Sequence, residues 1–204
     1  GGPGASSGSD HHVLYLDTAG APNNCTLYEL YNAQNWTGPG WTAINGAIFH
    51  LGTNALRTEG WTSADAAGLP ILPGLVRFAE VKAGAIKHAI RFTMASSANY
   101  YIHPATHAAG SGAPPSRPPM GLRLRLKASY TIPSSAGAEA KVILQAMKTY
   151  GLILADNGSN WFVTGDSDDG WTSTIMEKLN SDLGAVKGNN FEVVDTGAWV
   201  VQPG

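Results

Sequence analysis

Two carboxylates in the sequence have the surroundings of a catalytic pair. Glu29 lies in an aromatic, strand-like segment, Tyr28-Glu29-Leu30-Tyr31, and Asp156 precedes Asn157 and Gly158. Hydrolysis of a glycosidic bond needs one protonated acid and one ionised carboxylate, and an apolar setting raises the pKa of the acid. We therefore predict Glu29 as the acid and Asp156 as the base or nucleophile. The structural alternative is that Glu29 pairs with an arginine and Asp156 caps its own turn.

His88 and His107 are the histidines best placed to assist those carboxylates. His88 alternates with apolar residues, which predicts a place on the apolar face of a strand. His103 and His107 have a spacing that suits a metal on a helix, but Pro104 forces His103 out of a helix. His88 and His107 would act as acid and base beside Asp156, or would hold the metal of a metal-dependent hydrolase. The alternative for His88 is a core histidine with satisfied hydrogen bonds.

Three tryptophans are candidates for contact with a sugar. Trp61 and Trp171 each follow a glycine, and Trp161 follows a turn-like Asp-Asn-Gly-Ser-Asn segment. Flat rings exposed in turns are typical stacking platforms, whereas core packing is the alternative for each of them. We predict that Trp61, Trp161 and Trp171 line the substrate site.

Together these residues predict a carbohydrate-active protein, and we favour a glycoside hydrolase that acts on a polysaccharide. The alternative is a non-catalytic module that binds a glycan or builds an extracellular assembly. In that alternative, the aromatic turns make the contacts and neutralising Glu29 has no effect on binding. The sequence predicts no cofactor and no assigned metal ligand, and its single cysteine excludes a zinc site built from cysteines.

The composition narrows the setting and the partners. Charged residues are 14% of the chain, against about 25% in an ordinary domain, and the 25 glycines and 12 prolines fit a chain with many turns. This favours a secreted, extracellular protein. A formal net charge of −2 gives no cationic footprint for nucleic acid. No apolar run approaches the roughly 20 residues of a membrane-spanning helix, so a membrane is not an expected partner.

The elements that must position these residues are mainly short strands. Apolar, β-prone segments predict strands at residues 12–17 and 25–31, a strand pair at 76–81 and 86–94, and a hairpin of 152–155 with 161–164. Amphipathic spacing predicts helices over about 136–150 and 174–183. The expected fold is a β-sandwich or jelly roll with these two helices. Residues 1–10 are expected to form a flexible lead, and residues 11–204 a single β-rich domain.

Three blocks of the sequence resemble a group of exported bacterial proteins. They are residues 60–77 (GWTSADAAGLPILPGLVR), 88–93 (HAIRFT) and 153–159 (ILADNGS). The resemblance covers most of the chain beyond residue 10 and implies export, but it implies no particular activity. Members of that group extend further at the N-terminal side. The resemblance therefore implies a processed or truncated form that associates with the missing segment or with itself.

Overall fold

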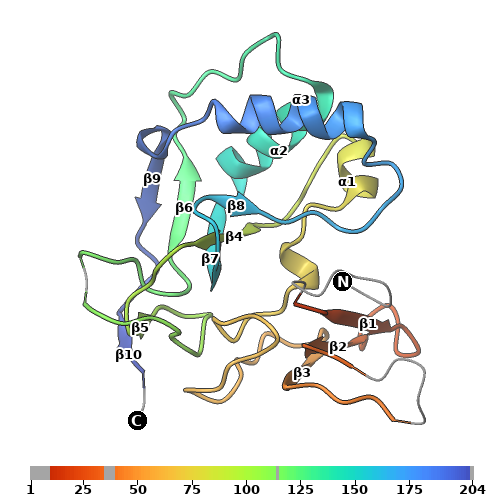
Figure 1. Cartoon of the computed structure of the whole chain (residues 1–204), viewed down its shortest axis with the longest axis vertical. Helices are drawn as coiled ribbons and strands as arrows, with labels where there is room; N and C mark the ends of the chain where they lie inside the picture. Colours follow the sequence, from red (N-terminus) through yellow and green to blue (C-terminus); the bar gives the residue numbers. More distant parts are fainter. Residues whose placement is uncertain (1–9, 35–39, 114, 203–204) are drawn as a thin grey trace.

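The computed structural model describes residues 10–34, 40–113 and 115–202. In this part of the chain, ten strands form three sheets, and three α-helices accompany them (Figure 1). The predicted β-rich character is confirmed.

The largest sheet has five strands in the order β8-β4-β7-β6-β9. Its two central strands, β4 and β7, are parallel, and every other pair is antiparallel. Leu152 to Ala155 on β7 are all buried, as expected for a strand with neighbours on both sides and layers above and below. The bounds are β4 (Ile90–Met94), β6 (Arg123–Leu126), β7 (Leu152–Asn157), β8 (Phe162–Val163) and β9 (Phe191–Val194).

Helices cover one face of this sheet (Figure 1). They are α1 (Phe78–Lys82), α2 (Ala138–Thr149) and α3 (Ser173–Gly184). The predicted apolar stripe of α2 is buried against the sheet: Ala140, Ile143, Leu144 and Met147. Both predicted helices are thus confirmed, with ends that differ by one or two residues.

A small antiparallel sheet, β1-β2-β3, lies on the other side of the molecule from the helices (Figure 1). Its strands are β1 (Val13–Asp17), β2 (Thr26–Tyr31) and β3 (Asn45–His50). It packs on the irregular segment 61–75 through an apolar cluster of Ala64, Ile71 and Leu75 with Leu14, Tyr31 and Leu72. A third sheet pairs β5 (Tyr100–Tyr101) with β10 (Val200–Val201).

The predicted sandwich or jelly roll is not confirmed, because helices and not a second sheet lie on one face of the large sheet. Two parallel neighbours need a long crossover connection. Between β4 and β7 the chain passes through β5, β6 and α2, and α2 packs against the sheet. The crossover therefore places a helix where a sandwich would place strands.

Two local predictions are corrected. Residues 76–81, predicted as a strand, overlap the helix α1, whose first amide, Phe78 N–H, donates to Asp166 Oδ1 at 2.9 Å. That acceptor lies 88 residues away in the sequence. A tertiary contact therefore outweighs the local β-prone pattern of this segment. The predicted hairpin of 152–155 with 161–164 is also absent, because β4 lies between β7 and β8.

Candidate functional site

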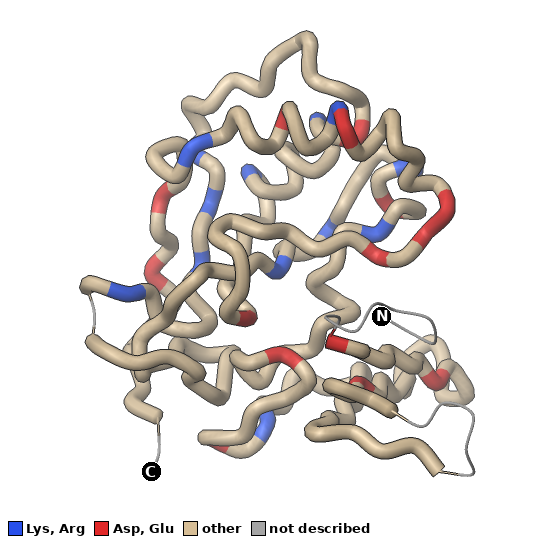
Figure 2. Tube along the Cα trace, viewed as in Figure 1, with Lys and Arg blue, Asp and Glu red and all other residues tan. Residues whose placement is uncertain are grey.

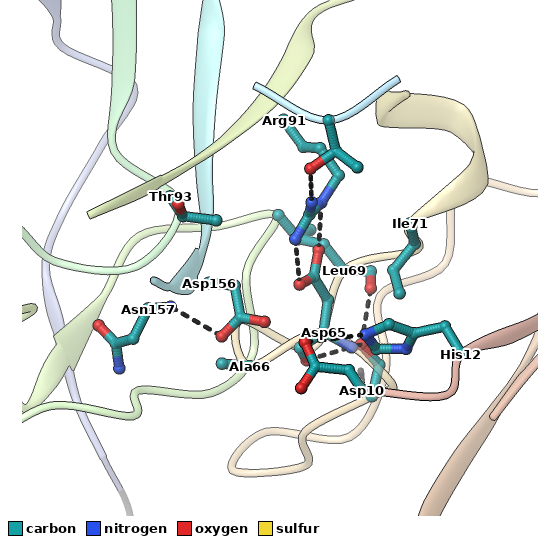
Figure 3. A network of polar contacts seen from close by, with 12 residues as sticks. Asp10, His12, Asp65, Ala66, Leu69, Ile71, Arg91, Thr93, Asp156 and Asn157 are labelled. Atoms are coloured by element: carbon teal, nitrogen blue, oxygen red, sulfur yellow. Dashed lines mark hydrogen bonds and ion pairs between the residues drawn. The ribbon is translucent and has the colours of Figure 1, made fainter. Parts of the chain in front are cut away.

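A buried ion pair lies at the centre of the polar network in Figure 3. The guanidinium of Arg91, on β4, donates from Nε to Asp65 Oδ2 at 2.8 Å and from a terminal nitrogen to Asp65 Oδ1 at 2.6 Å. Its other terminal nitrogen donates to Thr164 Oγ1 at 2.7 Å. The Asp65 side chain has no solvent exposure. Such a two-pronged contact satisfies both charges without water.

Asp156 joins this pair because of a bulge in β7. Arg91 and Phe92 pair with Ile153 and Leu154, but Thr93 then pairs with Asp156, so Ala155 has no partner on β4. Strand side chains alternate between faces, and the extra residue therefore moves Asp156 to the face that carries Arg91. A regular strand would have pointed this carboxyl toward the helices with Leu152 and Leu154.

The environment of Asp156 favours its protonated form near neutral pH. Burial, followed by the negative charge of Asp65, raises the pKa of Asp156 to about 8. Its Oδ1 also accepts the N–H of Asn157 at 2.7 Å, which supports the predicted capping of its own turn. The negative charge of Asp65 thus adds to burial in favouring the neutral form of Asp156.

Glu29 is fully enclosed. Oε1 accepts the backbone N–H groups of Ile71 and Leu72, each at 2.9 Å, and Oε2 accepts Ile71 N–H at 2.8 Å. The predicted alternative, an ion pair with an arginine, is replaced by these backbone contacts at the start of the 3-10 helix Leu72–Gly74. Burial raises the pKa of Glu29 to about 7, although the backbone N–H donors act in the opposite direction. Its carboxylate joins the small sheet to segment 61–75.

The two predicted carboxylates thus surround the same ion pair from different elements. The charges of Asp65 and Arg91 act on the pKa of both Glu29 and Asp156. Neither Asp65 nor Arg91 was predicted from the sequence. The available signal was Asp65 within an apolar block, Ala64-Asp65-Ala66-Ala67, where a carboxylate needs a buried cation.

The two predicted histidines, His88 and His107, lie apart from each other in their contacts and share no partner. His88 precedes β4 and has both ring nitrogens engaged, Nδ1 with Ala89 O at 2.9 Å and Nε2 with Glu80 Oε2 at 3.1 Å. His107 contacts Ala66 O through Nδ1 at 2.8 Å. Both are half-buried. Their predicted catalytic roles stay predictions, and no group of three or more potential metal-ligating His, Cys, Asp or Glu residues occurs in the described part of the chain.

The predicted tryptophans also differ from one another. Trp161 lies between Phe92 and Phe191, with ring centroids 5.7 and 5.1 Å away. Trp171 packs edge-on against Phe78 at 4.9 Å and donates its indole N–H to Asp166. Trp61 is different, because 60% of it is exposed.

Trp61 lines a cleft of about 790 Å³ between the large sheet and the small sheet. The large sheet contributes Arg91, Ile153, Ala155 and Arg123, and β3 contributes Ile48, Phe49 and His50. The remaining walls are residues 51, 53–58, 68–70 and 73–74, with His88, Ala89 and Pro104. Glu29, Asp156 and His107 do not line this cleft.

Three of the polar residues that line the cleft are arginines. Arg91 and Arg123 each pair with Ile153, from the two strands that flank β7. Arg57 lies over the rings of Phe49 and Trp61, with its guanidinium carbon 5.4 and 6.0 Å from the two centroids. Figure 2 shows that the strands of the small sheet carry no Lys or Arg, so the charge of the cleft comes from the large sheet and the loop of Arg57.

Comparisons of the chain with protein-family models, curated proteins and solved structures returned no match. The resemblance to exported bacterial proteins therefore stays a prediction. Within the described residues, no helix has the length and apolar character needed to cross a bilayer.

Proposed function

We propose that this chain binds a glycan in the cleft between the two sheets, in an extracellular setting. The observation that supports this proposal best is the position of Trp61, a 60% exposed indole that lines the cleft beside several hydrogen-bond donors. Binding sites for small ligands combine apolar or aromatic walls with a few convergent polar groups. A sugar ring presents an apolar face to an indole and hydroxyl groups to arginine and histidine.

The size of the cleft agrees with this proposal. About 790 Å³ falls within the usual range of roughly 300 to 1,000 Å³ for ligand sites. The floor includes Ile153 and Ala155, and the rim includes Thr53, Asn54 and Thr58. The neutral polar groups of the rim are suited to sugar hydroxyls.

The test is calorimetry of the whole chain against a panel of oligosaccharides, with Trp61→Ala and a matched control. Trp199 is 47% exposed and does not line the cleft, so Trp199→Ala removes an indole of similar exposure elsewhere. We expect Trp61→Ala to weaken binding by up to about tenfold, from a loss of about 0.5 to 1.5 kcal/mol of ring contact. Equal effects of the two substitutions, or no binding to any oligosaccharide, would contradict the proposal.

Hydrolysis of the bound glycan is a second candidate function. The feature that favours it is the raised pKa of Asp156, about 8, which suits a general acid at neutral pH. A glycosidase needs a second carboxylate about 5 to 9.5 Å from the first. Asp65 is held by the guanidinium of Arg91, so it is not free to act on a sugar. Glu29 could act on a sugar only after its hydrogen bonds from the backbone N–H groups of Ile71 and Leu72 were broken.

Release of reducing ends from a polysaccharide panel tests this second candidate. Hydrolysis by the wild type that is lost in both Asp156→Asn and Glu29→Gln would support it, provided that both variants remain folded. Glycan binding without any release would leave the binding function and remove the catalytic one.

A further inference from the structure

The cleft contains basic residues without acidic ones. Its described lining includes Arg57, Arg91 and Arg123, with His50 and His88, but no Asp and no Glu. The whole chain has 15 acidic and 13 basic residues, so an all-basic lining departs from its overall balance. The question is which of these cations already have a partner.

Arg91 and His88 are satisfied by the protein itself. Arg91 is neutralised by Asp65, and His88 contacts Glu80 and Ala89 O. Neither group therefore offers a free charge to a ligand.

Arg123 has no such partner within the described residues. Its neighbour on the same strand, Arg125, faces Glu192 across the β6–β9 pair and donates to it at 2.7 and 2.8 Å. The residue that faces Arg123 on β9 is Val194, which offers no acceptor. Arg123 is half-buried, and burial lowers its pKa. The sheet thus provides a counter-ion for one arginine and leaves the other without one, inside the cleft.

Arg57 is a second arginine of the cleft without an ion pair among the described residues, although the charge of Glu29 acts on its pKa. One terminal nitrogen donates to Thr62 O at 2.8 Å, but its Nε is buried and has no hydrogen-bond partner. A cation removed from water without an anion is unfavourable, and a carboxylate or sulfate oxygen relieves that cost. Arginine suits both groups because its planar fork donates two parallel hydrogen bonds.

We infer that the glycan bound in this cleft is acidic and that Arg123 and Arg57 bind its carboxylate or sulfate-ester groups. This inference rests on the proposed glycan-binding function and specifies its ligand. Trp61 would then contact the sugar ring while the two arginines bind the charged substituent, so that neutral glycans lose the larger part of the affinity.

The test compares four ligands of equal length by calorimetry at 50 mM salt: a galacturonate hexamer, its methyl ester, a sulfated galactan hexamer and a neutral galactan hexamer. Citrate and inorganic sulfate are the sugar-free controls. The variants are Arg123→Gln, Arg57→Gln and the control Arg125→Gln, which removes a charge two residues away on the same face. Thermal unfolding of each variant confirms that it is folded.

We expect the galacturonate, the sulfated hexamer or both to bind about tenfold or more tightly than their neutral counterparts, because a charged hydrogen bond contributes about 1.5 to 3 kcal/mol. Arg123→Gln should abolish that preference and Arg125→Gln should retain it. The difference between the carboxylate and sulfate arms identifies the group. Raising the salt to 500 mM should weaken the wild-type preference, which tests the charge without any substitution.

Three results would count against the inference, each in a different way. Equal binding of acidic and neutral hexamers would overturn it and leave the glycan-binding function standing. Equal binding of citrate or sulfate and the hexamers would keep the arginine site but overturn the glycan-binding function. No binding of any ligand would overturn both.

Discussion

Arg91 and Arg123 flank Ile153 on one face of the large sheet, in register across three neighbouring strands. Two strand spacings separate their backbones by about 10 Å. Although their positions are equivalent, Arg91 has the buried carboxylate of Asp65, whereas Arg123 faces the cleft without a described counter-ion. Both arginines line the cleft, but the first is neutralised by the protein and the second has no described counter-ion.

This difference predicts unequal costs of removing the charges. Asp65→Asn leaves the Arg91 guanidinium buried without its counter-charge, so we expect a loss of about 3 to 5 kcal/mol in the free energy of unfolding. Arg123→Gln removes no described hydrogen bond and should change that free energy by less than about 0.5 kcal/mol. Urea unfolding of both variants checks the contrast, and similar losses would contradict it.

Stability should fall as the pH rises from 7 to 9. The unfolded Asp156 is ionised throughout this range, whereas the folded one loses its proton through a pKa of about 8. The folded state therefore binds more protons, and stability decreases with pH by at most about 1.4 kcal/mol per pH unit for one proton. Urea unfolding at several pH values measures the slope.

Asp156→Asn removes that proton and should flatten the pH profile above about pH 8, whereas Glu29, with a pKa of about 7, still adds to the slope at lower pH. Asp168→Asn, an exposed acid, is the control and should keep the wild-type slope. Below pH 7 the profile is mixed, because burial lowers the pKa of His12 and its protonation opposes folding. An unchanged slope in Asp156→Asn would show that another group titrates.

Glu29→Gln should destabilise the contact between the two sheets without altering ligand affinity. An amide has one acceptor oxygen, and its NH₂ group would face a backbone N–H of Ile71 or Leu72. We expect a loss of about 1 to 3 kcal/mol, the cost of a buried unsatisfied donor. Unfolding and calorimetry of the same sample separate the two effects.

The tryptophans should divide by role. Trp161→Ala removes a ring packed against Phe92 and Phe191 and should cost about 3 kcal/mol of stability, less than a fully buried ring because Trp161 is partly exposed. Trp61→Ala should cost less than about 1 kcal/mol and affect glycan binding instead. Loss of stability in Trp61→Ala but not in Trp161→Ala would reverse these assignments.

Gly74 tests how closely the cleft wall approaches Arg91. A Cβ at this position would lie 2.9 Å from the Cβ of Arg91, which is closer than two non-bonded carbon atoms normally pack. A side chain cannot move its Cβ by rotation, so the backbone itself would have to shift. Gly74→Ala should therefore cost about 1 to 3 kcal/mol. Gly184→Ala is the comparison for space alone, since its Cβ would meet nothing within 4 Å and its φ is not in the positive range.

Local patterns in the sequence were sufficient for several features. The stripe of α2 is set by residues three and four apart, which lie on one face of any helix with this sequence, and the structure buries that stripe. The alternation of Leu124 and Leu126 with arginines likewise indicates two faces of β6, and the leucines are buried. The acid at position 29 was correctly singled out as unusual, because it shares a strand face with apolar side chains.

The pairing of distant segments was decided by the tertiary structure alone. The bulge at Ala155 that redirects Asp156 depends on its register with β4, about 60 residues earlier in the chain. The insertion of β4 between β7 and β8 replaced an expected hairpin, and the Asp166 contact turned an expected strand into α1. In each case a local preference of a fraction of a kcal/mol was outweighed by burial and hydrogen bonds that only the assembled fold supplies.

The same division applies to the candidate site. The sequence by itself determined which groups are present: a carboxylate among aromatic residues, an acid before a turn, tryptophans next to glycines or turns, and few charged residues overall. Only the folded chain decided that Asp65 neutralises Arg91, that Glu29 is enclosed by backbone amides, and that Arg123 lies in the cleft without a counter-ion among the described residues. The physical reason is that the charge state and access of a side chain depend on its neighbours in space, and those come from elements far apart in the sequence.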